Sequence, residues 1–339
     1  MTKLLEIKEK VFCFWGKYEV YLKFVYKFFL ALAVFLLINN TIGFMESIST
    51  VSVAFILAFV CCLLPQSITL ITAAAIIVLD LYVLSIEVAI TALLIFALIF
   101  FLYFRFAPKD GLLFILTPIC FSLHIPYVLP IASGLLRKIY SVAAVACGTI
   151  VFFFLNGIYE NVTALQSTEG ATKMTITAGQ LLSNKEMYLT VVVFILSSVV
   201  VYVVRKMSMD HAWKVAIISG ALVQISGLFV GYLLLDISGR TVGMLLGNLV
   251  AIILGLLIEF IFMDLDYSRT ERVQFEDDDY YYFVKAIPKK MVSSSDKEII
   301  QFSGFSSLDK LKERRKNSEN PVSRQQIVDE LNIEEEYLK

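Results

Sequence analysis

The sequence predicts an all-α polytopic membrane protein with a small cytoplasmic α+β tail. Hydrophobic residues make up 58% of the 339 positions and charged residues 17%, whereas a soluble domain carries about 25% charge. Long charge-free runs fill most of residues 28–263, and charge is concentrated in residues 264–339. We therefore divide the chain into a cytoplasmic N-terminal arm over residues 1–27, a transmembrane domain over residues 28–263 and a cytoplasmic tail over residues 264–339.

The transmembrane domain contains about ten hydrophobic segments. A helix needs about 20 apolar residues to cross a hydrocarbon core of about 30 Å, or somewhat fewer when charged ends snorkel. Residues 111–124 and 126–136 are too short to cross alone, and they contain Pro118, Pro126 and Pro130, which remove backbone donors and kink helices. These two segments are expected to form either a re-entrant hairpin or a pair of broken helices. The remaining segments are 28–44, 50–64, 67–84, 87–104, 139–158, 189–204, 214–235 and 241–263.

Lysine and arginine residues gather on one side of the predicted segments. Cytoplasmic loops carry the excess of these residues in membrane proteins. Both termini are therefore expected in the cytoplasm and residues 159–188 outside, whether residues 111–136 cross twice or dip and return. The basic residues concerned are six lysines of the N-terminal arm, Arg105 with Lys109, Arg137 with Lys138, and Arg205, Lys206 and Lys214.

Small residues recur at every fourth position of the last segment. Such a stripe lets another helix approach closely, which favours helix packing in a bilayer. The preceding segment also carries glycines, so the last two segments are expected to pack as a tight hairpin, although a homo-oligomer contact would use the same stripe. The stripe consists of Gly239, Gly243, Gly247, Ala251 and Gly255, and the preceding segment adds Gly220, Gly227 and Gly231.

An acidic residue, Glu259, continues this stripe near the cytoplasmic end of the last segment. Counting back through the turn between the last two segments places Lys214 at the same depth. A pair between the two side chains would remove an isolated charge, which is costly in a membrane. Two interpretations follow: a structural ion pair or snorkelling acid, and a site for a coupling ion or a proton.

Three more polar residues are candidates for an intramembrane role. Asp80 and Glu87 bracket the turn between the third and fourth segments, and His124 lies beside Pro126. Ionisable residues within spans are functional candidates, and a histidine titrates near neutral pH and could relay protons. The simpler expectation is that both acids are solvated at the turn and that His124 is an interfacial or hydrogen-bonded side chain.

Several functional classes are disfavoured by what the sequence lacks. It contains no GxxxxGK[ST], GxGxxG, HExxH or GxSxG motif, so we expect no enzymatic activity and no cofactor. Two histidines and five scattered cysteines predict no zinc or other metal site. A net charge of −1 gives no basic face for nucleic acid.

The tail is expected to contain small elements only. Residues 269–288 alternate around Asp277–Asp279 and are rich in β-branched and aromatic residues, which predicts a hairpin. Residues 323–326 fit a capping box before a closing helix. Elements this small cannot bury a large core, so the tail is expected to dock a protein partner or to support the membrane domain.

Residues 267–290, YSRTERVQFEDDDYYYFVKAIPKK, resemble a segment that follows the last span in uncharacterised multi-pass membrane proteins of Firmicutes such as Clostridia. The VQFEDDDYYYFVKAIPKK portion carries the resemblance, and the layout of the apolar segments before it is similar as well. The resemblance implies a multi-pass protein of a bacterial plasma membrane. It implies no activity, so no functional residue is transferred from it.

Two functions from different classes are consistent with these patterns. The first is a permease-like protein or the membrane subunit of a transport system. It is favoured by the broken segments, the intramembrane acids and a faint similarity between residues 72–88 and 117–132, since repeated halves with broken helices are typical of secondary transporters. The second is a membrane scaffold that recruits a partner through its tail. The spans carry few charges, so the sequence indicates neither substrate nor energy source.

Overall fold

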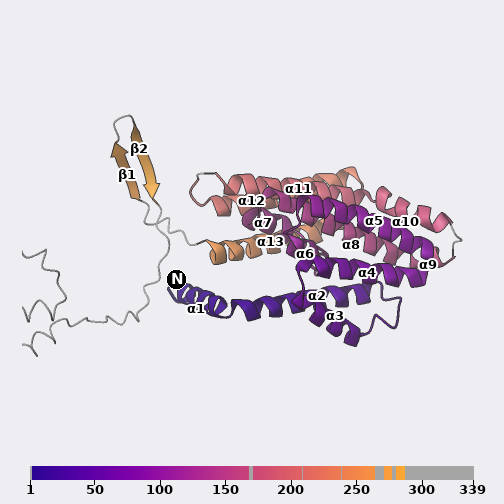
Figure 1. The fold of residues 1–339 in the computed structure, drawn as a ribbon. Helices are drawn as coiled ribbons and strands as arrows, with labels where there is room; N and C mark the ends of the chain where they lie inside the picture. Colours follow the sequence, from indigo (N-terminus) through magenta and orange to yellow (C-terminus); the bar gives the residue numbers. More distant parts are fainter. Residues whose placement is uncertain are drawn as a thin grey trace, which may run out of the picture. The chain divides into compact units, whose positions relative to one another are not determined.

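The computed structural model describes residues 2–167, 171–207, 209–237, 239–263, 271–276 and 280–286. Within these ranges the chain is almost entirely helical up to Met263, and a two-stranded sheet follows (Figure 1). The elements are α1 (Thr2–Lys17), α2 (Glu19–Thr41), α3 (Val51–Leu63), α4 (Gln66–Leu84), α5 (Ile86–Phe106), α6 (Gly111–Ser122), α7 (Val128–Leu136), η1 (Ile139–Ser141), α8 (Val142–Glu160), α9 (Val162–Ser167), α10 (Ala171–Ser183), α11 (Lys185–Arg205), α12 (Ala212–Leu234), α13 (Thr241–Phe262), β1 (Glu271–Glu276) and β2 (Tyr281–Ala286).

Seven helices among the described residues are long and apolar enough to cross a membrane, namely α2, α4, α5, α8 with the preceding η1 turn, α11, α12 and α13. Helices α3 and α6 are apolar but shorter, and α7 has only nine residues. Each of the ten predicted segments coincides with a helix, although only seven of these helices have the length of a full span. An all-α polytopic membrane protein is confirmed. Large apolar side chains are exposed along the spans, as contact with lipid requires.

Contacts between helix ends show which ends lie together. Lys27 Nζ of α2 donates to the Leu64 carbonyl that follows α3 (3.2 Å), so α3 runs back along α2. Lys8 Nζ of α1 donates to the Phe260 carbonyl near the end of α13 (2.7 Å), so the first helix meets the end of the last. We call this the inner end of the bundle, and we call the opposite end, where residues 160–167 and 171–188 lie, the outer end.

Helices α6 and α7 form a re-entrant hairpin. Arg137 Nε, just after α7, lies 3.5 Å from Asp110 Oδ1, just before α6, so the two ends of the hairpin lie together. Its tip reaches α13, where a β-carbon at Gly247 would lie 3.5 Å from the His124 carbonyl oxygen. The 12 residues of α6 rise about 18 Å, which is less than a hydrocarbon core of about 30 Å. Of the two forms expected for residues 111–136, the structure has the hairpin.

Glycines allow two neighbouring helices to approach this hairpin closely. A β-carbon at Gly148 of α8 would lie 2.9 Å from the Phe114 carbonyl oxygen of α6. A β-carbon at Gly134 of α7 would lie 2.8 Å from the Ser198 carbonyl oxygen of α11. These distances are shorter than van der Waals contact, so a larger residue at either position would push the hairpin away from its neighbour.

The glycine stripe of α13 is a packing face, and the hairpin is one of its two partners. A β-carbon at Gly247 would lie 2.5 Å from the Tyr127 ring at the hairpin tip. A β-carbon at Gly255 would lie 3.4 Å from Ile131 of α7 and 3.0 Å from Ile217 of α12. The middle of α13 is therefore wedged between α12 and the re-entrant hairpin.

The other glycines do not pack as predicted. Gly239 forms the turn before α13 with φ +90°, and neither it nor the exposed Gly243 has a described atom that a β-carbon would meet within 4 Å. Gly220, Gly227 and Gly231 all face side chains of α11. Gly255 does pack closely on α12, as predicted for the last two segments. The expectation that the glycines of α12 share this contact is wrong, because α12 turns its glycine face toward α11.

The faint similarity between residues 72–88 and 117–132 does not correspond to a structural repeat. The first stretch lies in the continuous helix α4 and the start of α5, whereas the second runs through the break between α6 and α7. Tyr82 is 60% exposed, and its counterpart Tyr127 packs against α13.

Two paired strands lie in the stretch where the sequence predicts a hairpin. Strands β1 and β2 pair antiparallel, from Glu271 opposite Ala286 to Glu276 opposite Tyr281. The predicted closing helix after residues 323–326 and the remainder of the tail lie outside the described residues.

We expect Gly247→Leu to destabilise the protein and Gly243→Leu to leave its stability nearly unchanged. The two positions are one helical turn apart on α13, but only Gly247 meets the Tyr127 ring. Overpacking typically costs about 1–3 kcal/mol, here through lost van der Waals contact between helices. The measurement is the melting temperature of each purified variant in one detergent. Equal melting temperatures would show that the hairpin tip does not pack on α13.

Candidate functional site

A layer of buried polar side chains lies between α7, α11, α12 and α13. Its members are Ser133, Ser197, Ser198, Gln224 and Asn248, each at most 1% exposed. Gln224 Nε2 donates to Ser197 Oγ (2.9 Å), and Ser197 donates to a backbone carbonyl of α12 (3.1 Å). The Ser133 and Ser198 hydroxyl oxygens lie 2.6 Å apart. We call these five side chains the polar layer.

Apolar side chains close the polar layer on both sides. Along α11, α12 and α13, the residues Ser197, Gln224 and Asn248 each lie between a member of an inner apolar cluster and a member of an outer one, whereas Ser133 of α7 is flanked by inner-cluster residues on both sides. Both clusters are well packed, so the polar layer is occluded from either end of the bundle. The inner cluster consists of Ile131, Leu135, Val201, Ala216, Ile217, Ala221 and Ala251. The outer cluster consists of Val193, Leu228, Tyr232 and Met244.

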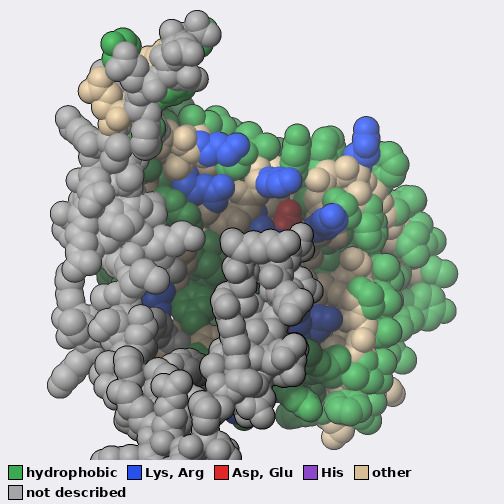
Figure 2. All heavy atoms as spheres, turned by 60° about the vertical axis from the view of Figure 1, so that its left-hand side comes forward, with side chains coloured by type: hydrophobic (Ala, Val, Ile, Leu, Met, Phe, Trp, Pro, Cys, Tyr) green, Lys and Arg blue, Asp and Glu red, His purple; other side chains and the backbone are tan. Residues whose placement is uncertain are grey.

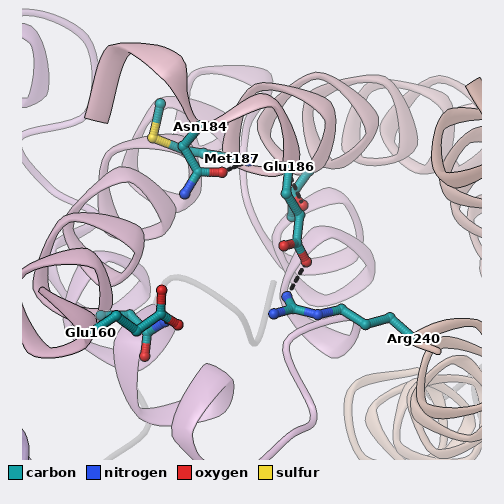
Figure 3. Close-up of polar contacts among 7 residues, drawn as sticks. Glu160, Asn184, Glu186, Met187 and Arg240 are labelled. Atoms are coloured by element: carbon teal, nitrogen blue, oxygen red, sulfur yellow. Dashed lines mark hydrogen bonds and ion pairs between the residues drawn. The ribbon is translucent and has the colours of Figure 1, made fainter. Parts of the chain in front are cut away.

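An ion pair joins α11 and α13 at the outer end. Arg240, immediately before α13, donates to Glu186 in the first turn of α11, and the two side chains point toward one another in Figure 3. Asn184 caps α11 by accepting from the Met187 N–H (3.0 Å). Glu160, the other acid in this view, bonds within its own helix. The ion pair therefore ties the outer ends of two helices that also contribute to the polar layer.

Two tyrosines lie between this ion pair and the polar layer. Tyr127 comes from the hairpin tip and Tyr232 from near the end of α12, and their side chains interact with each other and with the charges of Glu186 and Arg240. From Arg240 to Asn248 the chain of α13 rises about 12 Å. The outer closure thus consists of an ion pair above a pair of aromatic rings.

The inner end is basic. Figure 2, which turns the left-hand end of Figure 1 toward the viewer, shows lysine and arginine side chains gathered there, with few acidic side chains in view. Arg205 of α11 donates to the Leu135 carbonyl at the end of α7 and lies over the Trp213 ring. Burial raises the pKa of Asp110 above its ordinary value, and the nearby Arg137 guanidinium opposes this rise. These contacts hold the base of the hairpin at the inner end.

Glu259 and Lys214 do not form the predicted ion pair. Glu259 is 8% exposed on the buried face of α13, whereas Lys214 is exposed on α12. Both side chains are described, and none of the ion pairs among the described residues joins them. Lys214 lies between Ala212 and Ala216 of the buried stripe of α12 and points away from it. The expected pairing fails because the two residues lie on different faces of the helix pair.

Asp80 is fully buried, so the expectation that it is solvated is wrong. Its Oδ1 accepts from the Met45 N–H in the loop before α3 (3.2 Å), and its Oδ2 has no hydrogen-bond partner among the described residues. Glu87 is half-buried and accepts from the Ser85 hydroxyl (2.7 Å). His124 is exposed, with the positive φ of 60° that turns the hairpin tip. Of these three candidates only Asp80 enters the protein interior, and the structure does not bring it to the polar layer.

An apolar cavity of about 50 Å³ lies on the other side of the hairpin, between α2, α4, α5, α6 and α8. All of its lining side chains are apolar, and Pro118 of α6 is among them. Ligand sites combine apolar walls with a few polar groups that orient the ligand. The cavity lacks such groups, so the polar layer is the better candidate for a functional site.

The polar layer was missed by the sequence analysis. None of its side chains is charged, so a search for ionisable residues passes over them. The available signal was the presence of single amides, Gln224 and Asn248, near the middle of two apolar spans, since polar side chains inside spans usually bond across helices. A hydroxyl pair, Ser197 and Ser198, marks the same depth on α11.

No protein-family model, curated protein or solved structure matches this chain. The fold and the site together define a polytopic helical membrane protein with a re-entrant hairpin beside an occluded polar layer.

We expect a double-mutant cycle to show no coupling between Glu259 and Lys214. Residues without contact have effects on stability that add within about 0.3–0.5 kcal/mol. The measurement compares the stability of Glu259→Gln, Lys214→Met and the double variant in detergent. Recovery of stability in the double variant beyond that margin would mean that the two side chains do pair.

Proposed function

We propose that this chain is a permease-like protein of a bacterial plasma membrane, acting alone or as the membrane subunit of a transport system. The observation that carries the proposal is the occluded polar layer beside the re-entrant hairpin. A carrier needs polar groups near the middle of the bilayer and closures that open alternately. Broken helices commonly line such sites in secondary transporters.

The two closures differ in their physical character. The outer one depends on the Glu186–Arg240 pair, in which the Arg240 side chain is 56% exposed. A solvent-exposed ion pair contributes only about 0–1 kcal/mol, so the pair itself adds little to the cost of separating α11 from α13 at this end. The inner closure is an apolar cluster that includes Ile131 and Leu135 of α7. Opening it requires a shift of α7, whose base is held by Arg205.

The proposed orientation places the inner end in the cytoplasm. The lysine and arginine residues of the inner end support it, because cytoplasmic loops carry the excess of these residues. Helix α1 of the N-terminal arm and the end of α13 then lie in the cytoplasm.

The outer closure can be tested by thiol labelling. Met244 is 1% exposed beneath the closure, and Cys13 is the exposed one of the five native cysteines. In a Cys13→Ser background, Met244→Cys should react slowly with a membrane-impermeant thiol reagent. Adding Glu186→Gln should raise the rate severalfold, because the outer ends of α11 and α13 lose their link. Thr163→Cys, exposed in α9, controls for general reactivity.

The charge-reversed pair Glu186→Arg with Arg240→Glu should restore slow labelling of Met244→Cys, since it rebuilds the attraction. If Glu186→Gln leaves the labelling rate unchanged, or if the reversed pair labels as fast as Glu186→Gln, the ion pair does not close the polar layer and the permease proposal loses its outer closure.

The orientation can be tested on intact cells in the same background. We expect Thr163→Cys to react with the impermeant reagent directly, because α9 lies at the outer end. Lys109→Cys, exposed in the loop between α5 and α6, should react only after the cells are permeabilised. The reverse pattern would invert the proposed topology.

The alternative function, a membrane scaffold, is favoured by the β-hairpin of the tail. Tyr280, Tyr281 and Tyr282 are 67%, 62% and 47% exposed. A two-stranded hairpin is marginally stable by itself, so a protein partner that covers these rings would stabilise it. A scaffold of this kind has no need of the outer closure, and the labelling experiment therefore separates the two functions.

A further inference from the structure

Two amide side chains of the polar layer, Gln224 of α12 and Asn248 of α13, lie at the same depth in the bundle. A β-carbon at Gly255 would lie 3.0 Å from Ile217 Cγ2, which fixes the register of these antiparallel helices. Gln224 follows Ile217 by two helical turns, and Asn248 precedes Gly255 by two helical turns. Two turns rise by the same amount on either helix, so the two amides lie at the same depth.

Hydrogen bonds fix the direction in which each amide points. Ser197 donates its hydroxyl hydrogen to the Gly220 carbonyl (3.1 Å), so its oxygen must accept from the nitrogen of Gln224 (2.9 Å). Asn248 Nδ2 donates to the Met244 carbonyl (3.0 Å), which can only accept. The oxygens Gln224 Oε1 and Asn248 Oδ1 remain, and neither has a hydrogen-bond partner among the described residues.

A buried acceptor without a partner is costly in a low-dielectric interior. Two such acceptors at one depth favour an occupant that carries positive charge or donates hydrogen bonds. The charged side chains of α11 and α12 cannot serve, because they lie at the helix ends. They are Lys185, Glu186, Arg205 and Lys214.

We propose that the polar layer binds a monovalent cation of about the size of Na⁺, held by Gln224 Oε1 and Asn248 Oδ1. Carbonyl and hydroxyl oxygens are suitable ligands for a hard cation, and divalent ions favour carboxylates. The hairpin strengthens the site, because the C-terminal end of α6, the negative end of its dipole, leads to the His124 carbonyl beside Gly247. This inference rests on the proposed function and names the ion that the permease carries or couples to.

The test is the thermal stability of the purified full-length protein in detergent at increasing NaCl, with choline chloride holding the ionic strength constant. A ligand that binds only the folded state stabilises it as its concentration exceeds the Kd. We expect the melting temperature to rise by about 3 °C or more. Choline is too large for a fully buried site and should give no rise. Equal melting temperatures in Na⁺, K⁺, Li⁺ and choline would overturn the proposal and leave a water molecule as the occupant.

Variants locate the response. Asn248→Ala should abolish the rise with Na⁺, whereas Asn156→Ala, which removes an amide bonded within α8, should retain it. Asn248→Asp keeps the shape and adds a negative charge, so its response should shift to at least tenfold lower Na⁺ concentration. This near-isosteric variant also tests the site if Asn248→Ala does not fold. An unshifted response in Asn248→Asp would place the cation elsewhere and overturn the assignment.

The failure of this inference is distinguishable from failure of the proposed function. Labelling of Met244→Cys reports on the outer closure without requiring a cation. If Glu186→Gln raises the labelling rate of Met244→Cys as expected but the melting temperature does not rise with Na⁺, the cation site is rejected and the permease proposal is retained.

Discussion

A membrane offers no water to a broken helix, so the backbone groups between α6 and α7 must be covered by protein. This constraint determines much of the arrangement around residues 111–136. Helix α8 approaches α6 at Gly148, α11 approaches α7 at Gly134, and α13 approaches the tip at Gly247. Each glycine permits a contact that a side chain would prevent. The hairpin thus occupies the interior, and the long helices that surround it carry the lipid-facing surface.

The hairpin also separates two environments of opposite character. On the side of α6 the neighbours are α2, α4, α5 and α8, and the cavity between them is lined only by apolar side chains. On the side of α7 the neighbours are α11, α12 and α13, and the layer at mid-depth is polar. Neutral amides and hydroxyls keep the desolvation cost of this layer low, since buried charges would cost far more. Any specificity of the layer therefore comes from the positions of its oxygens.

The sequence predicted what depends on length and composition, and it could not predict what depends on rotation about a helix axis. The spans followed from apolar runs, and Pro118, Pro126 and Pro130 predicted the break without deciding its form. Depth along a helix can be counted, but the face cannot, which is why Lys214 was paired with Glu259. The glycine stripe indicated close packing but not its partner, because periodicity within one helix contains no information about its neighbours. Gln224 and Asn248 gained significance only when the register of α12 and α13 placed them at the same depth.

The short helix α3 has a consequence for the surrounding lipid. Its 13 residues rise about 20 Å, and its outward face exposes Phe55, Ile56 and Phe59. A hydrocarbon core of about 30 Å is thicker than the length of α3, and local thinning of the bilayer beside α3 is one way to accommodate this mismatch. In that case the loop that supplies the Met45 N–H to Asp80 lies in a local thinning of the bilayer, where headgroups and water come closer to that buried carboxyl. A change in membrane thickness would therefore affect the protein mainly on the side where α3 faces the lipid.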